Sequence, residues 1–303
     1  MAEIDLEYGS ILEQIVNYGY EYEDPNRKGV IRKEIPTATL RYDLSDGTFP
    51  AITLKKLYWK GVVGELLWFL SGDSSIKPLH KMGIHFWDKD YERWQKSAIG
   101  MGASGTLGRV YGVQWRQFGL TFDSVDQIEY LINNLIEKPL ATDHIVTAWN
   151  PTDRNYMALD PCHFMFQVVV YPIGGEEKYG FDFIWSQRSS DIYLGIPINI
   201  ASYALLAKML EKITGYKAMT LIGDLRNVHL YDNQIDAAKE LLLRMRENKY
   251  PDARLKINST DTIFKMMASD FDSSLECLSI DDFELEGYDS YPNIKVPMLT
   301  RDE

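Results

Sequence analysis

The sequence lacks most of the features that mark secreted, membrane-spanning or metal-binding proteins. It has only two cysteines in 303 residues, Cys162 and Cys277, which are too few for a disulfide framework and do not have zinc-site spacing. Its longest apolar stretches, such as residues 66–70, are too short to span a bilayer, and its N-terminus lacks the basic and then apolar pattern of a signal peptide. We therefore expect a soluble protein without a metal centre in a reducing compartment, the cytoplasm, or the host cytoplasm if the source is viral.

Basic residues are also scarce. The chain carries 32 Lys and Arg against 44 Asp and Glu, for a formal net charge of −12. Duplex nucleic acid is not an expected partner, because binding to its phosphates needs clustered positive charge. A small anionic ligand held by a few arginines is compatible with this charge. The hydrophobic content of 45% is enough for the core of one large domain or two small ones, and no internal repeat or low-complexity linker divides the chain.

The apolar pattern predicts a mixture of helices and strands. Helical spacing predicts helices over residues 8–17, 59–70, 125–137, 199–214 and 234–247, the fourth capped by Asn199 and ended by Gly215. Alternating or β-branched and aromatic runs predict strands over 37–44, 145–149, 164–171, 181–185 and 283–286. Segments 21–34 and 97–108 are predicted loops, and 173–175 a hairpin connection. Runs of strands with helices beside them indicate an α+β fold with helices against one sheet.

Cys162 is the first candidate for chemistry. It lies in Asp160-Pro161-Cys162-His163, just before a predicted strand. An isolated cysteine is usually a small buried hydrophobic residue. A reactive thiolate needs a partly exposed, polar setting, and here polar groups flank the thiol while Pro161 fixes the backbone before it. The residues alone leave both interpretations open, whereas Cys277 is interpreted as structural.

Three other segments contain polar residues whose setting suggests a role. Glu65 lies in the otherwise apolar stretch 62–68, where burial would raise the pKa of its carboxyl toward the range useful for proton transfer, although a structural role has a slight advantage. The segment 187–191, Gln-Arg-Ser-Ser-Asp, is either an anion site or an ordinary solvated strand end. His229 and Tyr231 are two residues apart, so they face the same side of a strand and could bind a sugar hydroxyl or form a core pair.

Taken in order along the chain, these segments resemble the folate-dependent thymidylate synthase family over almost the full length. The matching motifs lie at residues 64–70, 109–116, 148–151, 157–159, 161–163, 187–206, 283–289 and 294–297. The resemblance implies a single catalytic domain over residues 1–303. It also implies an α+β fold with a large mixed β-sheet that forms the interface of a homodimer and helices packed on one side.

The resemblance also implies roles for individual residues in attaching a one-carbon unit to dUMP, with 5,10-methylenetetrahydrofolate as cosubstrate. Cys162 is similar to the nucleophile that adds to C6 of uracil, and Glu65 to the carboxylate that acts through water on the base and the folate. Tyr111 resembles the tyrosine that assists proton removal from C5. Asn199 resembles the amide that reads uracil, where cytosine-acting relatives have Asp. The remaining implied ligands are Arg27, Arg188 and Ser189 for the phosphate, His229 and Tyr231 for the ribose, His163 and Gln187 for the nucleotide, and Trp87, Asp191 and Gly195 for the folate.

The sequence departs from the family pattern at several positions. Thr142 and Asp143 stand where the family has a pair of arginines donated across the dimer to the phosphate, and their loss is expected to weaken phosphate binding unless Lys28 or Arg154 replaces them. Asp160 replaces a small or apolar residue beside the nucleophile, where it would raise the thiol pKa or position a water. Three further departures are Asn227 for an acidic residue, Leu225 and Arg226 for glycines, and a chain that continues through Arg301-Asp302-Glu303.

These departures keep two alternatives to thymidylate synthesis open. A dUMP hydroxymethylase would share every step up to the exocyclic methylene and then add water instead of hydride, and Asp160 and the altered tail are where that difference would arise. A non-catalytic relative that binds nucleotide or RNA as a regulator is the second alternative. The retained Cys162, Glu65 and Asn199 favour an enzyme, and the tail motif and Trp87 favour the synthase over the hydroxymethylase.

Overall fold

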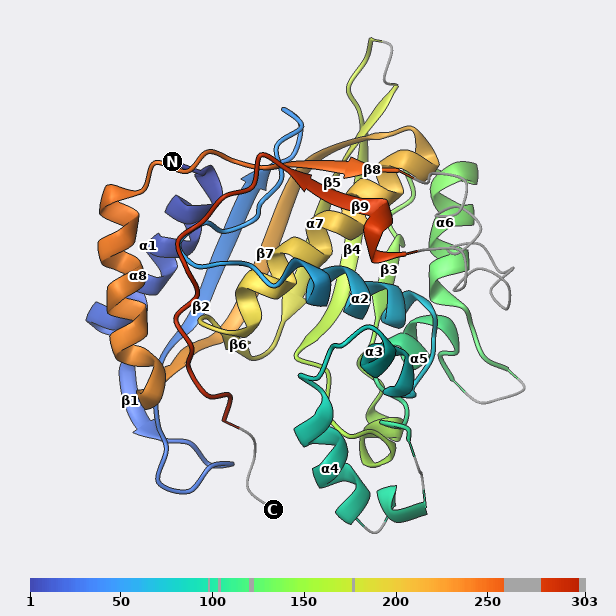
Figure 1. Cartoon of the computed structure of the whole chain (residues 1–303). Coiled ribbons are helices and arrows are strands. Elements are labelled where there is room, and N and C mark those ends of the chain that lie inside the picture. The colour runs from blue at the N-terminus through green and yellow to red at the C-terminus, as the bar shows by residue number, and fades with distance from the viewer. Residues whose placement is uncertain (98, 103–104, 120–122, 176–177, 259–278, 300–303) are drawn as a thin grey trace.

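The computed structural model describes residues 1–97, 99–102, 105–119, 123–175, 178–258 and 279–299 (Figure 1). Cys277 therefore lies outside the described residues. No helix in these ranges is both long and apolar enough to cross a membrane. The helices are α1 (Glu3–Tyr18), α2 (Trp59–Leu70), α3 (Lys77–Lys81), α4 (Asp88–Lys96), α5 (Tyr111–Arg116), α6 (Gln127–Glu137), α7 (Gly195–Thr214) and α8 (Ile235–Glu247). The strands are β1 (Tyr20–Glu23), β2 (Ile31–Asp43), β3 (Ile145–Thr147), β4 (His163–Pro172), β5 (Tyr179–Gln187), β6 (Ser190–Asp191), β7 (Lys217–Tyr231), β8 (Arg254–Ile257) and β9 (Phe283–Glu286).

A mixed sheet of seven described strands forms the centre of the molecule. Its order is β1-β2-β7-β5-β4-β3, and the short β6 also pairs with β7. The β5 and β6 strands run parallel to β7, while the other neighbouring pairs are antiparallel. The β8 and β9 strands form a separate two-stranded sheet. The predicted α+β class, with a large mixed sheet, is confirmed.

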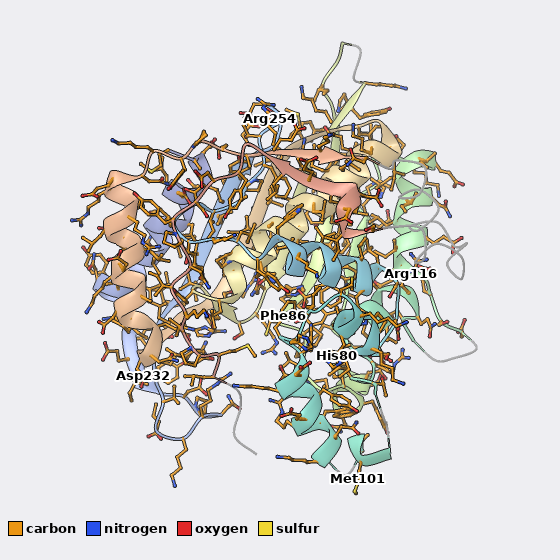
Figure 2. All side chains as sticks on the ribbon, in the orientation of Figure 1. His80, Phe86, Met101, Arg116, Asp232 and Arg254 are labelled. Atoms are coloured by element: carbon orange, nitrogen blue, oxygen red, sulfur yellow. The ribbon has the colours of Figure 1, made fainter. Side chains whose placement is uncertain are left out.

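Helices cover one face of this sheet. Figure 1 shows α2 and α7 in front of the central strands, and the ring of Tyr203 on α7 stacks on Trp185 of β5 with centroids 5.5 Å apart. Side chains fill the space between these layers, while the labelled charged residues Asp232 and Arg254 lie at the periphery (Figure 2). Along β2, Leu40 and Tyr42 are buried, whereas the alternate residues are exposed. Because successive strand residues point to opposite faces, the second face of the sheet is open in this single chain.

The prediction that Asn199 caps a helix is wrong. The α7 helix begins four residues earlier, at Gly195, so Asn199 lies inside it. The Asp191 carboxylate accepts hydrogen bonds from the backbone N–H groups of Tyr193 and Leu194 in the turn before the helix, at 3.0 and 2.8 Å. The side chain of Asn199 is therefore available for other contacts. Gly215 does end the helix, as predicted, in the left-handed conformation (φ 70°) that glycine adopts without strain.

The prediction of a loop over residues 21–34 is wrong at both ends. The β1 strand pairs antiparallel with the start of β2, so this charged segment is a hairpin. The hydroxyls of Tyr20 and Tyr22 donate to the two carboxylate oxygens of Glu34, and Arg32 forms an ion pair with the same carboxylate. Cross-strand hydrogen bonds from tyrosine hydroxyls to a carboxylate replace the apolar alternation on which the strand prediction relied.

Candidate active site

A single cavity of about 650 Å³ brings together nearly all the predicted site residues. Its walls come from the β1–β2 hairpin, α2, the start of α4, α5, the β5–α7 connection, the end of β7 and the C-terminal tail. Its volume lies within the range of small-molecule binding sites. The predicted residues that line it are Arg27, Glu65, Trp87, Tyr111, Cys162, His163, Gln187, Arg188, Ser189, Asp191, Gly195, Asn199, His229 and Tyr231. Asp160 is the one predicted site residue that does not line it.

Cys162 is held in place through its backbone. Its N–H donates to the Tyr111 hydroxyl at 2.7 Å, and its carbonyl accepts from the backbone N–H of Arg188 at 2.8 Å. The Arg188 guanidinium donates to the carbonyls of Pro161 and Asp160, at 2.8 and 2.9 Å. A permanent positive charge is thus bound to the two residues that precede the thiol. The guanidinium therefore fixes the backbone that leads into Cys162.

Asp160 is bound from outside the cavity. Its two carboxylate oxygens accept from Nε and an Nη of Arg154, at 3.3 and 2.9 Å, in a bidentate ion pair. The predicted effect of Asp160 on the thiol pKa or on a water stays a prediction, and the structure shows its charge paired with that of Arg154. Arg154, proposed above as a replacement phosphate ligand, lies over the ring of Trp149 at 5.2 Å and does not line the cavity.

Glu65 is a buried carboxyl that lines the cavity, with 8% of its surface exposed. It lies in the apolar α2 helix, whose other residues from Gly61 to Leu70 are also buried. Burial raises the pKa of Glu65 from 4.5 to about 7, against the opposing effect of a 2.7 Å hydrogen bond that its carboxylate accepts from Trp87 Nε1. Both protonation states are accordingly populated near neutral pH, which suits a group that gives and takes protons.

A chain of hydrogen bonds sets the orientation of the Asn199 amide. The Trp185 indole can only donate, and its Nε1–H contacts Gln187 Oε1 at 3.3 Å. Gln187 therefore presents its Nε2 group to Asn199, whose Oδ1 accepts at 3.2 Å. The Asn199 Nδ2 group is then the donor available to a ligand.

The two histidines of the cavity are held neutral. Burial lowers the pKa of His163 to about 3, and its ring stacks on Tyr111 with centroids 4.3 Å apart. Burial and the nearby Arg32 lower the pKa of His229 to about 4. His229 Nδ1 is 2.7 Å from the Asn227 carbonyl, which can only accept, so Nδ1 carries the proton and Nε2 remains an acceptor. An acceptor at this position suits a hydroxyl ligand.

Asn227 has a structural role that explains one departure from the family pattern. It takes a left-handed backbone conformation (φ 48°), which asparagine tolerates better than most residues. Its Nδ2 donates to the Arg188 carbonyl at 2.8 Å, and its own carbonyl accepts from His229 and from Arg32. Asn227 therefore ties the predicted phosphate ligand to the predicted ribose ligand.

Arg27 and the C-terminal tail close one side of the cavity. The Arg27 guanidinium lies 4.7 Å from the centroid of the Tyr231 ring, and its Nε donates to the Leu299 carbonyl at 3.3 Å. Lys89 and Asn233 donate to the carbonyls of Met298 and Pro297. The tail is thus held by three separate segments. Arg301-Asp302-Glu303 lies outside the described residues.

Several cavity residues were not predicted from the sequence. Arg32 and Arg93 add positive charge, and Phe86, Ile198 and Met298 add apolar surface. Their residue types have no distinctive pattern, so only their place in the fold identifies them. Thr142 and Asp143 do not line the cavity, and Asp143 accepts hydrogen bonds from Tyr130 and Asn134 of α6.

A group of possible metal ligands lies outside the cavity. Among the residues that the structure describes, the group of three His, Cys, Asp or Glu side chains with converging ligand atoms is His80, His85 and Asp88. None of the three lines the cavity.

Comparison with known proteins agrees with the resemblance seen in the sequence. A family model described as thymidylate synthase matches residues 6–300. A thymidylate synthase of Mesoplasma florum is 34% identical over 307 aligned positions, covering 95% of this chain and 97% of the relative. A thymidylate synthase of Saccharomyces cerevisiae is 35% identical over 306 positions, covering 96% of each.

Proposed function

Because this chain belongs to the thymidylate synthase family, we propose that it transfers a one-carbon unit from 5,10-methylenetetrahydrofolate to C5 of dUMP and yields dTMP and dihydrofolate. The observation that carries the proposal is the meeting of Cys162, Glu65 and Asn199 in one cavity. A nucleophile, a carboxyl that titrates near neutral pH and an oriented amide are the groups that this chemistry needs.

In this proposal the Cys162 thiolate adds to C6 of the uracil ring. The π electrons of the C5–C6 double bond move toward O4, and C5 becomes the carbon nucleophile. Arg188, bound to the carbonyls of residues 160 and 161, holds the segment that positions the sulfur for attack. The folate, when bound, supplies the carbon and then the hydride. The covalent bond to Cys162 breaks as the product leaves.

Three groups manage the charge and protons of that adduct. The Asn199 Nδ2 group donates to O4, where negative charge develops, and the Gln187 contact keeps this donor facing the base. Glu65, with a pKa of about 7, exchanges protons with the base and the folate through water. Burial raises the pKa of Tyr111 well above its usual range, so its hydroxyl assists removal of the C5 proton as a neutral hydrogen-bonding group and not as a phenolate.

The remaining cavity residues bind the rest of the two molecules. Arg188, Ser189 and Arg27 hold the phosphate from within this chain, and His229 Nε2 accepts from the ribose hydroxyl, with Tyr231 beside it. Trp87, Asp191 and Gly195 form the folate side. His163 and Gln187 support the nucleotide site through hydrogen bonds with Tyr203 and Asn199, respectively.

We further propose that residues 1–303 act as one catalytic domain that assembles as a homodimer through the open face of the sheet. Ile145 and Val169 on that sheet are each 39% exposed, although both are large apolar residues. Burial against a second copy would remove this surface from water. Sedimentation measurements should give a dimer, and Val169→Asp should shift the population toward monomer.

The test is to incubate the purified protein with dUMP and methylenetetrahydrofolate, to identify the nucleotide by mass and to follow dihydrofolate by absorbance. The Cys162→Ser variant is the control. Formation of dTMP and dihydrofolate, absent with the variant, supports the proposal. Hydroxymethyl-dUMP with tetrahydrofolate would replace it with the hydroxymethylase alternative. That alternative relied on Asp160 and the altered tail. Asp160 is paired with Arg154 away from the cavity, and residues 301–303 lie outside the described residues. Binding of dUMP without any product would point to the regulator.

A further inference from the structure

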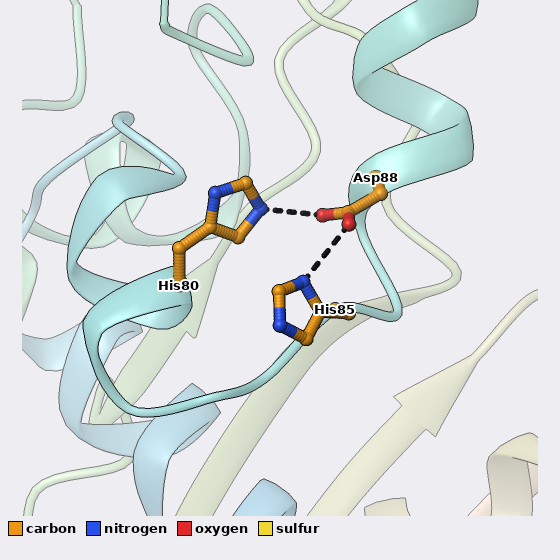
Figure 3. A group of neighbouring side chains, drawn as sticks. All are labelled: His80, His85 and Asp88. Carbon is orange, nitrogen blue, oxygen red and sulfur yellow. Dashed lines mark hydrogen bonds and ion pairs between the residues drawn. The ribbon is translucent and has the colours of Figure 1, made fainter.

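His80, His85 and Asp88 form a compact cluster outside the cavity (Figure 3). His80 lies in α3, His85 in the connection that follows, and Asp88 at the first position of α4. His80 Nε2 is 2.6 Å from Asp88 Oδ1, and His85 Nδ1 is 3.0 Å from Asp88 Oδ2. The two imidazole rings stack with centroids 4.9 Å apart. One ligand atom from each residue lies within 4.8 Å of the others, so the three converge on one point.

We propose that these three residues bind a divalent transition-metal ion of the zinc class, with water completing the coordination. Two imidazole nitrogens and one carboxylate oxygen are ligands that Zn²⁺, Co²⁺ and Ni²⁺ accept, whereas Ca²⁺ and Mg²⁺ prefer oxygen alone. Ligand bonds of about 2.0–2.2 Å in a tetrahedral site place the ligand atoms about 3.3 Å apart. The present separations of 2.6 and 3.0 Å differ from this by amounts that small side-chain rotations supply.

The three side chains are accessible to an ion. The side chains of His80, His85 and Asp88 are 39%, 60% and 34% exposed. The other three histidines of the chain, His144, His163 and His229, are buried. The exposed pair is therefore the imidazole site that a metal in solution meets first.

The place of the site gives a bound ion a structural consequence. Phe86 and Trp87 lie between His85 and Asp88 in the chain, and both line the cavity. Trp87 also donates the hydrogen bond to Glu65. An ion held by His80, His85 and Asp88 would tie the end of α3 to the start of α4 and restrict the segment that carries these two side chains. The site itself does not depend on the proposed function, and its test needs no activity.

The test is calorimetric titration of the tag-free full chain, stripped of metal, with ZnCl₂. The chain carries Cys162→Ser and Cys277→Ser so that thiolates do not compete for the ion. We expect one ion per chain. His80→Ala and His85→Ala should each weaken binding by more than the roughly 10–100-fold that loss of an outer-shell partner costs. Asp236→Asn, which removes an exposed carboxylate from α8, is the matched control and should leave the affinity unchanged.

Two spectroscopic measurements test directly whether His80 and His85 are the ligands. Co²⁺ in place of Zn²⁺ should give the visible absorption of a four-coordinate site, and His85→Ala should abolish it. In the chain with intact histidines, Zn²⁺ should shift the ring resonances of His80 and His85 and leave those of His144 unchanged, which tests the site even if a variant folds poorly. Absence of binding, or equal affinity after replacement of both exposed histidines, would overturn the proposal.

Discussion

Replacement of Glu65 by glutamine is expected to stabilise the folded protein at alkaline pH and to leave its stability unchanged at acid pH. The carboxyl of Glu65 is buried, and its pKa is raised from 4.5 to about 7. Between these two values the unfolded chain releases a proton that the folded chain retains. The folded state of the wild type therefore loses stability as the pH rises from about 4.5 to about 7. Glutamine does not titrate, so the variant escapes this loss.

The size of the effect follows from the difference between the two pKa values. At about 1.36 kcal/mol for each tenfold change in proton affinity, the difference corresponds to about 3 kcal/mol. The glutamine Oε1 can accept the same hydrogen bond from Trp87, now 2.7 Å long, so little packing is lost. Catalysis should fall at the same time by about 10²–10⁴-fold, the usual contribution of a positioned acid or base.

The assay is urea unfolding of both proteins at a fixed protein concentration, at pH 4, 5, 6, 7 and 8. The difference in free energy of unfolding should be near zero at pH 4 and should level off above pH 7 with the variant more stable. Glu13→Gln, an exposed change on α1, controls for the loss of one surface charge. A difference that does not vary with pH, or a wild type that is the more stable protein at pH 8, would refute the claim that burial raises the pKa of Glu65.

Three other changes test the cavity. Gln187→Glu should reverse the Asn199 amide, because a carboxylate accepts hydrogen bonds from both Trp185 and Asn199. The ratio of dCMP to dUMP affinity, measured by calorimetry, should then rise by about tenfold. An unchanged ratio would count against the hydrogen-bond chain from Trp185 through Gln187 to Asn199. Gly195→Ala places a methyl group 3.7 Å from Asn199 Oδ1, which is an ordinary contact, so thermal stability should be unchanged. The KM for the folate should rise, whereas the affinity for dUMP should not change. Equal effects on both ligands would show that Gly195 is not part of the folate site. Asp160→Asn should change dUMP affinity less than about threefold and leave dTMP as the product, because Arg154 already pairs with the carboxylate; a hydroxymethyl product would contradict this.

Prediction from the sequence succeeded where a pattern is local. The interior of α2 is apolar at successive positions, and Gly215 follows the last turn of α7, so both features can be read from neighbouring residues. The start of α7 could not be predicted in this way. The Asp191 side chain organises the turn before it, whereas the sequence pointed to Asn199, a residue that also commonly caps helices.

The β1–β2 hairpin shows the same limit. Its strands are rich in charged residues, which single-sequence reasoning assigns to a loop. Glu34 of β2 accepts hydrogen bonds from two tyrosines of β1 across the strands and forms an ion pair with Arg32 on its own strand. Such cross-strand contacts become visible only when both strands are placed.

The sequence by itself determined the family and the α+β class. It also identified fourteen residues that line the cavity, and Asp160 was the one predicted site residue that does not. These residues could be found because they stand in ordered motifs that are kept in the chain. Tertiary structure alone decided how those side chains behave. The pKa of Glu65 depends on burial by distant segments, and the Asn199 amide is oriented by Trp185 and Gln187 on β5. The charge of Asp160 is directed toward Arg154. Protonation and hydrogen-bond direction are set by neighbours in space. The same holds for the cluster of His80, His85 and Asp88, which no motif in the sequence predicted.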